Sequence, residues 1–211
     1  MPDQPSTLRA LRRSETQRVI QAHAVRLFTE RGYDATTVTD VAEAAGVSPM
    51  TVYRHFPTKE DLVLVDQNGP LVAERIAASS TAQPLVRRIS GALIDAATTL
   101  TSGGNGDDLT ANKRFLLARL RLMISTPALR ARHLDNNYAL QQAIVGAIEG
   151  DATDPDTAFH AQAAASACLA AMHTALVRWA EDDGRTELPD LIAKALAAAF
   201  GDDMVGTGPD A

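Results

Sequence analysis

The stretch that decides the fold is residues 37–56, TVTDVAEAAGVSPMTVYRHF. Apolar residues recur in its first half at the spacing of one helical face, and Gly46 stands where that helix must end. Thr37 and Ser48 are N-cap residue types, so a second helix begins directly after the turn, with Pro49 at its first position. We therefore predict two short helices joined by a tight turn, the arrangement of a helix-turn-helix.

The second helix of this pair has one inward and one outward face. On a wheel of about 100° per residue, Val52 and Phe56 point inward, whereas Met50 and Arg54 point furthest outward. Arginine can bond a guanine edge and methionine can contact a thymine methyl group, so these two positions are suited to reading bases. The flanking positions carry side chains suited to phosphate oxygens: Thr51, Tyr53 and His55.

The segment after this helix adds another candidate phosphate contact. Pro57 ends the helix, Thr58 caps the next one, and Lys59 lies at its start, where an ammonium group and the free helix amides both favour a phosphate. The alternative for the whole segment is that two short packed helices with a solvated Tyr-Arg-His face belong to an unrelated protein, such as an enzyme.

Two flanking segments extend the pattern. Residues 17–33 (QRVIQAHAVRLFTERGY) precede it and residues 51–62 (TVYRHFPTKEDL) close it. The three pieces match A-x-x-L-F-x-x-x-G-(Y/F), T-T-V-x-x-(I/V)-A-x-x-A-G-V-S and T-(V/L)-Y-x-H-F-x-x-K-x-x-L, in order and without insertion. Residues 14–74 therefore closely resemble the N-terminal domain of TetR-type (tetracycline-repressor-like) transcriptional regulators.

The resemblance implies an all-α homodimer of about nine helices per chain, with a three-helix DNA-binding domain and a larger helical domain for ligand binding and dimerisation. It implies a repressor that leaves a palindromic double-stranded operator when a small molecule binds. The implied DNA contacts are Thr37, Thr39, Ser48, Pro49, Met50, Thr51, Tyr53, Arg54, His55 and Lys59. A DNA-binding activator, or a non-enzymatic adaptor that has lost ligand control, remains the alternative.

Composition is consistent with a helical, non-secreted protein. The chain has 211 residues, 45% of them hydrophobic but only 4% aromatic, with one cysteine, Cys168. Its apolar content is mostly Ala, Leu and Val, which favours helices. There is no run of 18 apolar residues and no apolar N-terminal signal region, so we expect no membrane span and a bacterial cytoplasmic location.

The net charge of −6 is unevenly distributed. Six arginines lie in residues 8–31 against two glutamates, so the N-terminal end is basic: Arg9, Arg12, Arg13, Arg18, Arg26 and Arg31. Phosphate binding depends on local charge, since screening limits its reach to about 8 Å at physiological salt. We expect residues 1–13 to be a disordered basic arm, which either reaches the minor groove or is a solvated tail.

The rest of the chain divides into helices separated by turn residues. Ser14 and Gln17 form a capping-box pattern, so the first helix is expected to start near Glu15. A helix over residues 59–80 should kink or break at Asn68-Gly69-Pro70. Further helices are expected at 84–100, 109–125, 127–150, 155–181 and 188–200, with a frayed end after them. The predicted domains are 14–74, containing the 37–56 motif, and 84–200.

The last two long helices are candidates for a dimer interface. Residues 155–181 and 188–200 carry apolar residues over more surface than one core face requires, many of them alanines that allow close helix approach. We expect a four-helix interface from two copies of each.

A small apolar or amphipathic effector is expected among the preceding helices. The candidate lining residues are Phe115, Arg119, Met123, Tyr138, Met172, His173 and Trp179. Residues 126–133 (TPALRARH) faintly resemble the C-terminal domain of acyl-CoA-responsive members of the family, so an acyl-CoA is one candidate. The alternative is that these residues are ordinary core and the nearby arginines pair on a solvated face.

No catalytic set, cofactor site or metal site is predicted. Cys168 and His173 lie five residues apart on one helix, about 140° around its axis, and so do not converge. The five histidines have no zinc-site spacing. We therefore expect that the protein is not an enzyme.

Overall fold

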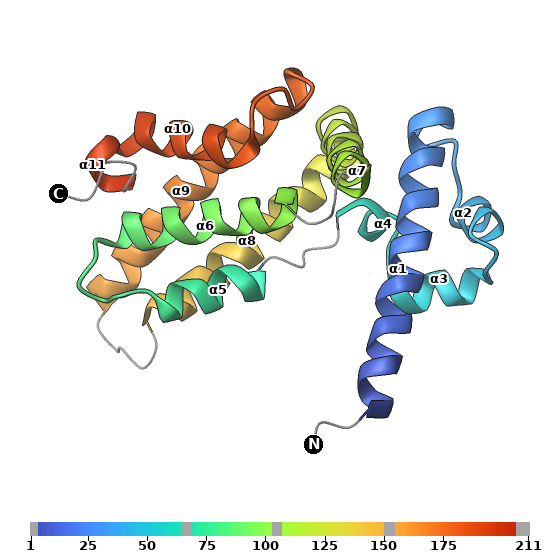
Figure 1. The fold of residues 1–211 in the computed structure, drawn as a ribbon, viewed down its shortest axis with the longest axis horizontal. Coiled ribbons are helices and arrows are strands. Elements are labelled where there is room, and N and C mark those ends of the chain that lie inside the picture. The colour runs from blue at the N-terminus through green and yellow to red at the C-terminus, as the bar shows by residue number, and fades with distance from the viewer. Residues whose placement is uncertain (1–3, 65–68, 103–106, 150–154, 206–211) are drawn as a thin grey trace. The chain divides into compact units, whose positions relative to one another are not determined.

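The computed structural model describes residues 4–64, 69–102, 107–149 and 155–205, and in these ranges every regular element is an α-helix (Figure 1). Nine helices of seven residues or more and two of four residues occur in the described part. The predicted all-α fold is thus confirmed. The chain forms two compact units. The first comprises residues 1–65 and 121–132, and the second comprises residues 66–120 and 133–211.

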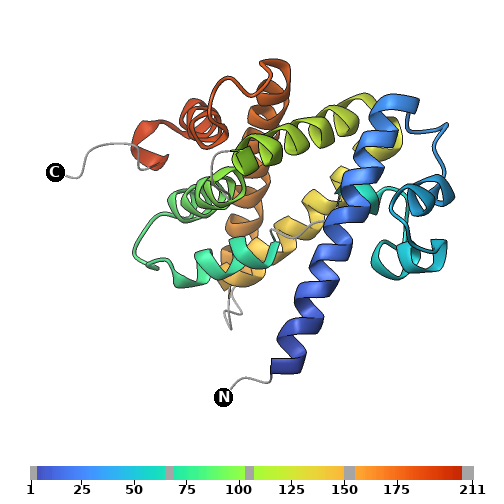
Figure 2. The ribbon, with the colours of Figure 1, turned by 45° about the vertical axis from the view of Figure 1, so that its right-hand side comes forward.

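The first unit contains four helices: α1 (Gln4–Arg31), α2 (Val38–Ala44), α3 (Pro49–His55) and α4 (Asp61–Leu64). Figure 2 shows α2 and α3 on the same side of α1, and α1 packs against both α2 and α4. Their shared core is apolar and almost fully buried, with Ile20, Ala24, Leu27, Phe28, Val41, Val52, Phe56 and Leu62 at 2% exposure or less. Burial of this core holds the short helices, which would be unstable alone.

Helix α1 differs from the prediction at its N-terminal end. It begins at Gln4, so residues 4–13 are helical rather than disordered, and the start predicted near Glu15 is wrong. The physical reason is visible in the segment QPSTLRALRR: Pro5 lies in the first turn, where it is tolerated, and Leu, Ala and Arg are strong helix formers. Ser14 therefore lies inside the helix instead of capping it.

The second unit contains the longer helices α5 (Gly69–Ala78), α6 (Leu85–Ser102), α9 (Pro155–Glu181) and α10 (Leu188–Phe200), with α11 (Asp202–Val205) at its end. Helices α7 (Asp107–Ser125) and α8 (Pro127–Glu149) belong to it except for residues 121–132. These bounds lie within about two residues of the predicted helices. The exception is α11, which falls in the segment that was expected to fray.

The interruption predicted at Asn68-Gly69-Pro70 falls partly on residues outside the described ranges and stays a prediction. Helix α4 ends at Leu64 and α5 begins at Gly69, with Pro70 in its first turn. Residues 65–68, including Asn68, lie outside the described ranges.

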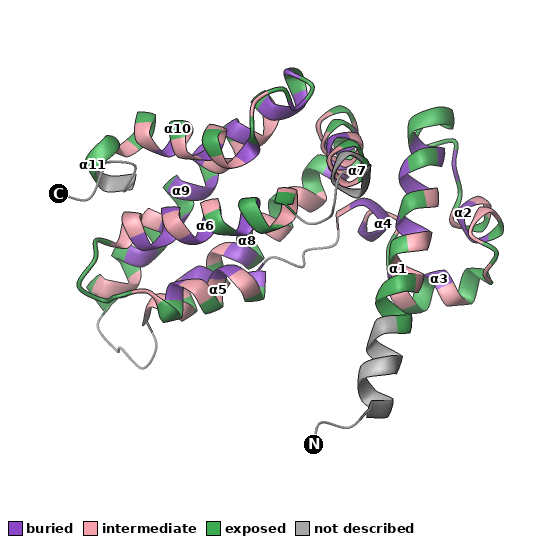
Figure 3. Ribbon diagram, in the orientation of Figure 1, coloured by how far each residue is buried: buried purple, intermediate pink, exposed green. Residues whose placement is uncertain are grey.

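The core of the second unit lies among α6, α9 and α10, which pack against one another. Trp179, Ile89, Ile192 and Leu196 are buried there at 1% exposure or less. Figure 3 shows buried segments in these helices beside exposed ones. In α10 the buried residues Leu188, Ile192 and Leu196 recur every four positions, as the apolar period read from the sequence predicts.

Candidate nucleic-acid interface and effector region

Helix α2 is held at its start by a reciprocal capping box. The amide of Asp40 donates to Thr37 Oγ1 at 3.1 Å, while the amide of Thr37 donates to Asp40 Oδ2 at 2.7 Å. The Thr37 hydroxyl donates to the same carboxylate oxygen at 2.6 Å, and these bonds lower the pKa of Asp40. Thr37 was predicted to contact phosphate, and its exposed side chain is also the cap of α2.

Gly46 makes the turn between α2 and α3. Its φ of +67° lies in the left-handed region, and the amide of Val47 donates to Ala42 O at 3.0 Å across the turn. A Cβ added at Gly46 would meet no atom within 4 Å. The glycine is therefore required by backbone conformation rather than by crowding.

Helix α3 is capped by Ser48 and oriented by two buried side chains. The amide of Thr51 donates to Ser48 Oγ at 3.1 Å, and the two hydroxyls lie 2.9 Å apart. Val52 and Phe56 are 0% and 1% exposed, and so fix which face of α3 turns outward. On the opposite face the side chain of Met50 is 75% exposed and that of Tyr53 is 49% exposed.

The other predicted DNA contacts lie on the surface of the same unit. Thr39, Ser48, Pro49 and Arg54 are exposed, whereas Thr51, His55 and Lys59 are half-buried. The structure therefore brings all ten predicted residues to the surface of one small helical unit. Their contact with DNA stays a prediction.

His55 is a half-buried imidazole at the end of α3. Burial lowers its pKa, and the nearby charges of Arg13 and Arg54 lower it further. Its Nδ1 is buried and makes no hydrogen bond within the described part of the chain. The effect of Arg13 on the pKa of His55 was not predicted, because it depends on α1 beginning well before residue 14.

The Lys59 ammonium contacts the end of α1 and the turn that follows it, and does not point freely outward. Its ammonium donates to Tyr33 O at 2.5 Å and lies 4.2 Å from the centre of the Tyr33 ring and 5.5 Å from that of Phe28. Tyr33 in turn donates its hydroxyl to Glu60 Oε1 at 2.7 Å, and burial followed by this bond raises its pKa. One N–H of the Lys59 ammonium is used by Tyr33 O, so a phosphate could be bound only by the other N–H groups.

The arginines of α1 fall into two groups. Arg18 pairs with Glu15 at 2.8 Å, and Arg26 pairs with Glu30 at 2.9 Å, so their charges are compensated locally. Arg12 and Arg13 are exposed and form no ion pair with any residue that the structure describes. Arg12 and Arg13 therefore leave uncompensated positive charge in the N-terminal half of this helix, and Arg31 in its last turn also forms no ion pair with a described residue.

The predicted effector residues belong to both units and differ in burial, so their grouping around one ligand stays a prediction. Phe115 and Arg119 lie together on α7, with the guanidinium 5.6 Å from the ring centre, and burial lowers the pKa of Arg119 to about 10. Met123 is 1% exposed and belongs to the first unit. Tyr138 is 62% exposed, which does not fit the wall of a closed pocket.

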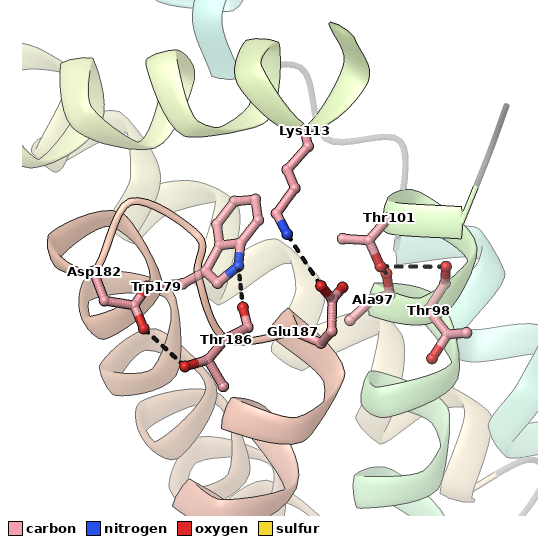
Figure 4. A network of polar contacts seen from close by, with 8 residues as sticks. All are labelled: Ala97, Thr98, Thr101, Lys113, Trp179, Asp182, Thr186 and Glu187. Carbon is pink, nitrogen blue, oxygen red and sulfur yellow. Dashed lines mark hydrogen bonds and ion pairs between the residues drawn. The ribbon is translucent and has the colours of Figure 1, made fainter. Parts of the chain in front are cut away.

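Trp179 is a packing residue in the described structure. It is 0% exposed, and its Nε1 donates to Thr186 O at 2.9 Å, as Figure 4 shows. The Thr186 hydroxyl donates to Asp182 at 2.9 Å, and Lys113 pairs with Glu187 at 3.1 Å beside it. These bonds fix the turn between α9 and α10 around the indole.

Met172 and His173 are half-buried neighbours on α9, and His173 faces α8. His133 Nε2 lies 3.2 Å from His173 Nδ1, and burial followed by the charge of His173 lowers the pKa of His133. Asn137 Nδ2 lies 3.3 Å from the same His133 nitrogen. The sequence did not predict this polar cluster, because its two histidines are 40 residues apart and share no sequence motif.

Cys168 is a packing residue of α9. The thiol is buried, which raises its pKa to about 11, so it is not a nucleophile near neutral pH. No described helix is long and apolar enough to cross a membrane.

Two family models match the chain. That of the bacterial regulatory proteins of the tetR family matches residues 20–65, and that of the MftR C-terminal domain matches residues 107–200. Together the two matches cover well over half of the chain.

Two relatives and one solved structure extend these matches. The transcriptional regulator TcmR of Streptomyces glaucescens is 30% identical over 155 residues, 70% of this chain and 66% of that protein. MftR of Mycobacterium tuberculosis, named for transcriptional regulation of mycofactocin biosynthesis, is 27% identical over 94% of this chain and 93% of its own. FadR of Bacillus subtilis, solved with stearoyl-CoA, has the same fold, with a TM-score of 0.52 at 20% identity over 87% of this chain and 97% of its own.

These relatives are named as transcriptional regulators, and the capped helix pair with its outward α3 is what such a regulator needs at its N-terminus. The chain belongs to the TetR family of bacterial regulatory proteins, a family of DNA-binding transcriptional regulators and not of enzymes.

Proposed function

We propose that this chain is a ligand-released repressor that binds a palindromic operator as a homodimer. The observation that carries the proposal is the outward face of α3, where Met50 and Tyr53 are exposed while Val52 and Phe56 anchor the helix from behind. A helix presented in this way fits the major groove. Two-fold symmetry would then pair two copies of α3 with half-sites about 34 Å apart.

The direct test is binding to the DNA upstream of the protein's own gene, measured by fluorescence anisotropy. Tyr53→Ala should weaken operator binding by roughly 1–3 kcal/mol, the value of one good contact. Tyr138→Ala is the matched control, since Tyr138 is a similarly exposed tyrosine on α8 in the other unit. Equal losses in both variants, or none in Tyr53→Ala, would refute the assigned role of α3.

The activator alternative predicts the same binding but the opposite effect on transcription. Expression from the promoter should rise when the gene is deleted if the protein represses, and fall if it activates. An adaptor without ligand control would bind no operator specifically at raised salt, where non-specific phosphate binding is lost.

The dimer is proposed to form through α9 and α10. The faces turned away from the core carry exposed small residues, with Ala163, Ala167 and Ala170 on α9 and Ala198 and Ala199 on α10. Small side chains allow the close approach of helices in a bundle. Ala167→Glu should convert the dimer to a monomer in sedimentation velocity, whereas Ala139→Glu, at an exposed alanine of α8, should not.

The effector is proposed to be an amphipathic molecule of the acyl-CoA class. Support comes from the shared fold with FadR of Bacillus subtilis, which was solved with stearoyl-CoA, and from the half-buried Arg119, whose charge suits an anionic ligand group. Stearoyl-CoA should release the protein from DNA, while free CoA should not, because the apolar chain contributes most of the binding energy. Release by neither compound would remove this class of effector and leave DNA binding standing.

A further inference from the structure

Two imidazole rings from different helices meet inside the second unit. His133 on α8 and His173 on α9 have ring centres 5.2 Å apart, with planes inclined by 31°. The two nitrogens that face each other, His133 Nε2 and His173 Nδ1, are separated by 3.2 Å. Both side chains are half-buried, so this pair is neither sealed in the core nor free in solvent.

The spacing of these nitrogens suits a shared metal ion. Imidazole nitrogens bind Zn²⁺ at about 2.0–2.1 Å. An ion at that distance from both nitrogens, given their 3.2 Å separation, makes an N–metal–N angle of about 100°, near the tetrahedral value. The distance between the two nitrogens is therefore compatible with one shared ion.

A third ligand is in place one turn along α8. Asn137 Nδ2 lies 3.3 Å from His133 Nε2, and a half-turn of the amide exchanges this nitrogen for the carbonyl oxygen. In the described ranges no group of three or more His, Cys, Asp or Glu side chains could hold a metal. The amide oxygen and water would thus complete the coordination.

We propose that His133, His173 and Asn137 form a binding site for a divalent first-row transition metal ion. Imidazole ligands select ions such as Zn²⁺, Co²⁺ and Ni²⁺, whereas Mg²⁺ and Ca²⁺ require oxygen ligands. The three residues all belong to the second unit. The competing arrangement is a simple imidazole–imidazole hydrogen bond that takes no ion.

The test is a titration of the untagged full-length protein with Co²⁺, followed by its visible absorption and by calorimetry. We expect one ion per chain and the d–d absorption of a low-symmetry site. His133→Ala and His173→Ala should each weaken binding at least tenfold, because even an outer-shell partner is worth about 10–100-fold in metal affinity. His160→Ala is the control, since His160 is an exposed histidine of α9.

Asn137→Asp provides a second test that a merely structural role would not pass. It replaces a weak amide ligand by a carboxylate, so Co²⁺ affinity should rise and the absorption should intensify. Circular dichroism verifies that each variant is folded. If a histidine variant unfolds, two other measurements test the proposal. They are the Co²⁺ affinity of Asn137→Asp and the broadening of histidine proton resonances by Co²⁺.

Two outcomes would overturn the proposal. The first is Co²⁺ affinity unchanged in folded His133→Ala and His173→Ala. The second is an unmodified protein that takes up no ion at millimolar Co²⁺, which would leave the imidazole–imidazole hydrogen bond as the whole role of the pair. Neither outcome bears on operator binding, which is measured without added metal.

Discussion

The guanidinium of Arg13 on α1 acts on the imidazole of His55 at the end of α3. Its charge, together with that of Arg54, adds to burial in lowering the pKa of His55. The N-terminal half of α1 is therefore electrically coupled to the helix that we expect to face DNA. Two predictions rest on this relationship.

The first concerns pH. The pKa of His55 is lowered in the free protein, and a bound phosphate would raise it by favouring the charged imidazole. The complex then holds more protons than the free protein. Operator affinity should therefore rise as pH falls through the window between the two pKa values, within about pH 5–8, and level off below it.

Fluorescence anisotropy at constant ionic strength measures this pH dependence, and His55→Gln provides the comparison. The variant should lose the part of the slope that His55 contributes, while contributions of the other histidines remain in both proteins. Identical slopes would mean that His55 does not touch phosphate.

The second concerns the unpaired arginines. Arg12 and Arg13 should bind phosphates, whereas the charges of Arg18 and Arg26 are compensated by glutamates. Replacing both Arg12 and Arg13 by Ala should lower the slope of log K against log salt by about 0.9 for each phosphate that is no longer neutralised. The double variant Arg18→Ala, Arg26→Ala is the matched control and should leave the slope nearly unchanged. An equal decrease in both double variants would point to net charge alone.

The third concerns the turn. Gly46→Ala should destabilise the protein by about 1–2 kcal/mol, because alanine must adopt a φ of +67° that glycine accepts freely. Space is not a factor, since no atom lies within 4 Å of the added Cβ. Gly146→Ala is the control, because Gly146 is an exposed helical glycine with equal room and should be neutral or stabilising. Urea denaturation of both variants measures the difference.

The fourth prediction separates the role of Thr37 as the cap of α2 from its predicted role as a phosphate contact. Thr37→Ala removes the capping box of α2 and should cost about 0.5–2 kcal/mol of stability. Thr37→Ser keeps an oxygen at the same place and should restore stability. If Thr37 also binds phosphate, Thr37→Ala should weaken operator binding beyond the stability loss, at a temperature where both proteins are fully folded. A stability equal to that of the unmodified protein would show that the cap is dispensable.

Most helix ends were predictable, because caps and turns are read from adjacent residues. Thr37, Gly46 and Ser48 each act on a backbone group within a few positions, so α2, the turn and α3 follow from the sequence. The start of α1 was misjudged for the opposite reason. The prediction gave more weight to a capping pattern at Ser14 than to the good helix formers of residues 8–13, and the helix extends to Gln4.

The sequence by itself determined the helices, the family and the outward face of α3, since these depend on local caps, on the apolar period and on a continuous motif. Only the tertiary structure decided which distant side chains meet. Lys59 is bound to the carbonyl of Tyr33 because packing of the first unit brings together the two turns that carry them. His133 lies against His173 because helix packing sets how α8 and α9 are rotated about their axes. A rotation of one residue, about 100°, would separate the two histidines, and no local pattern encodes it.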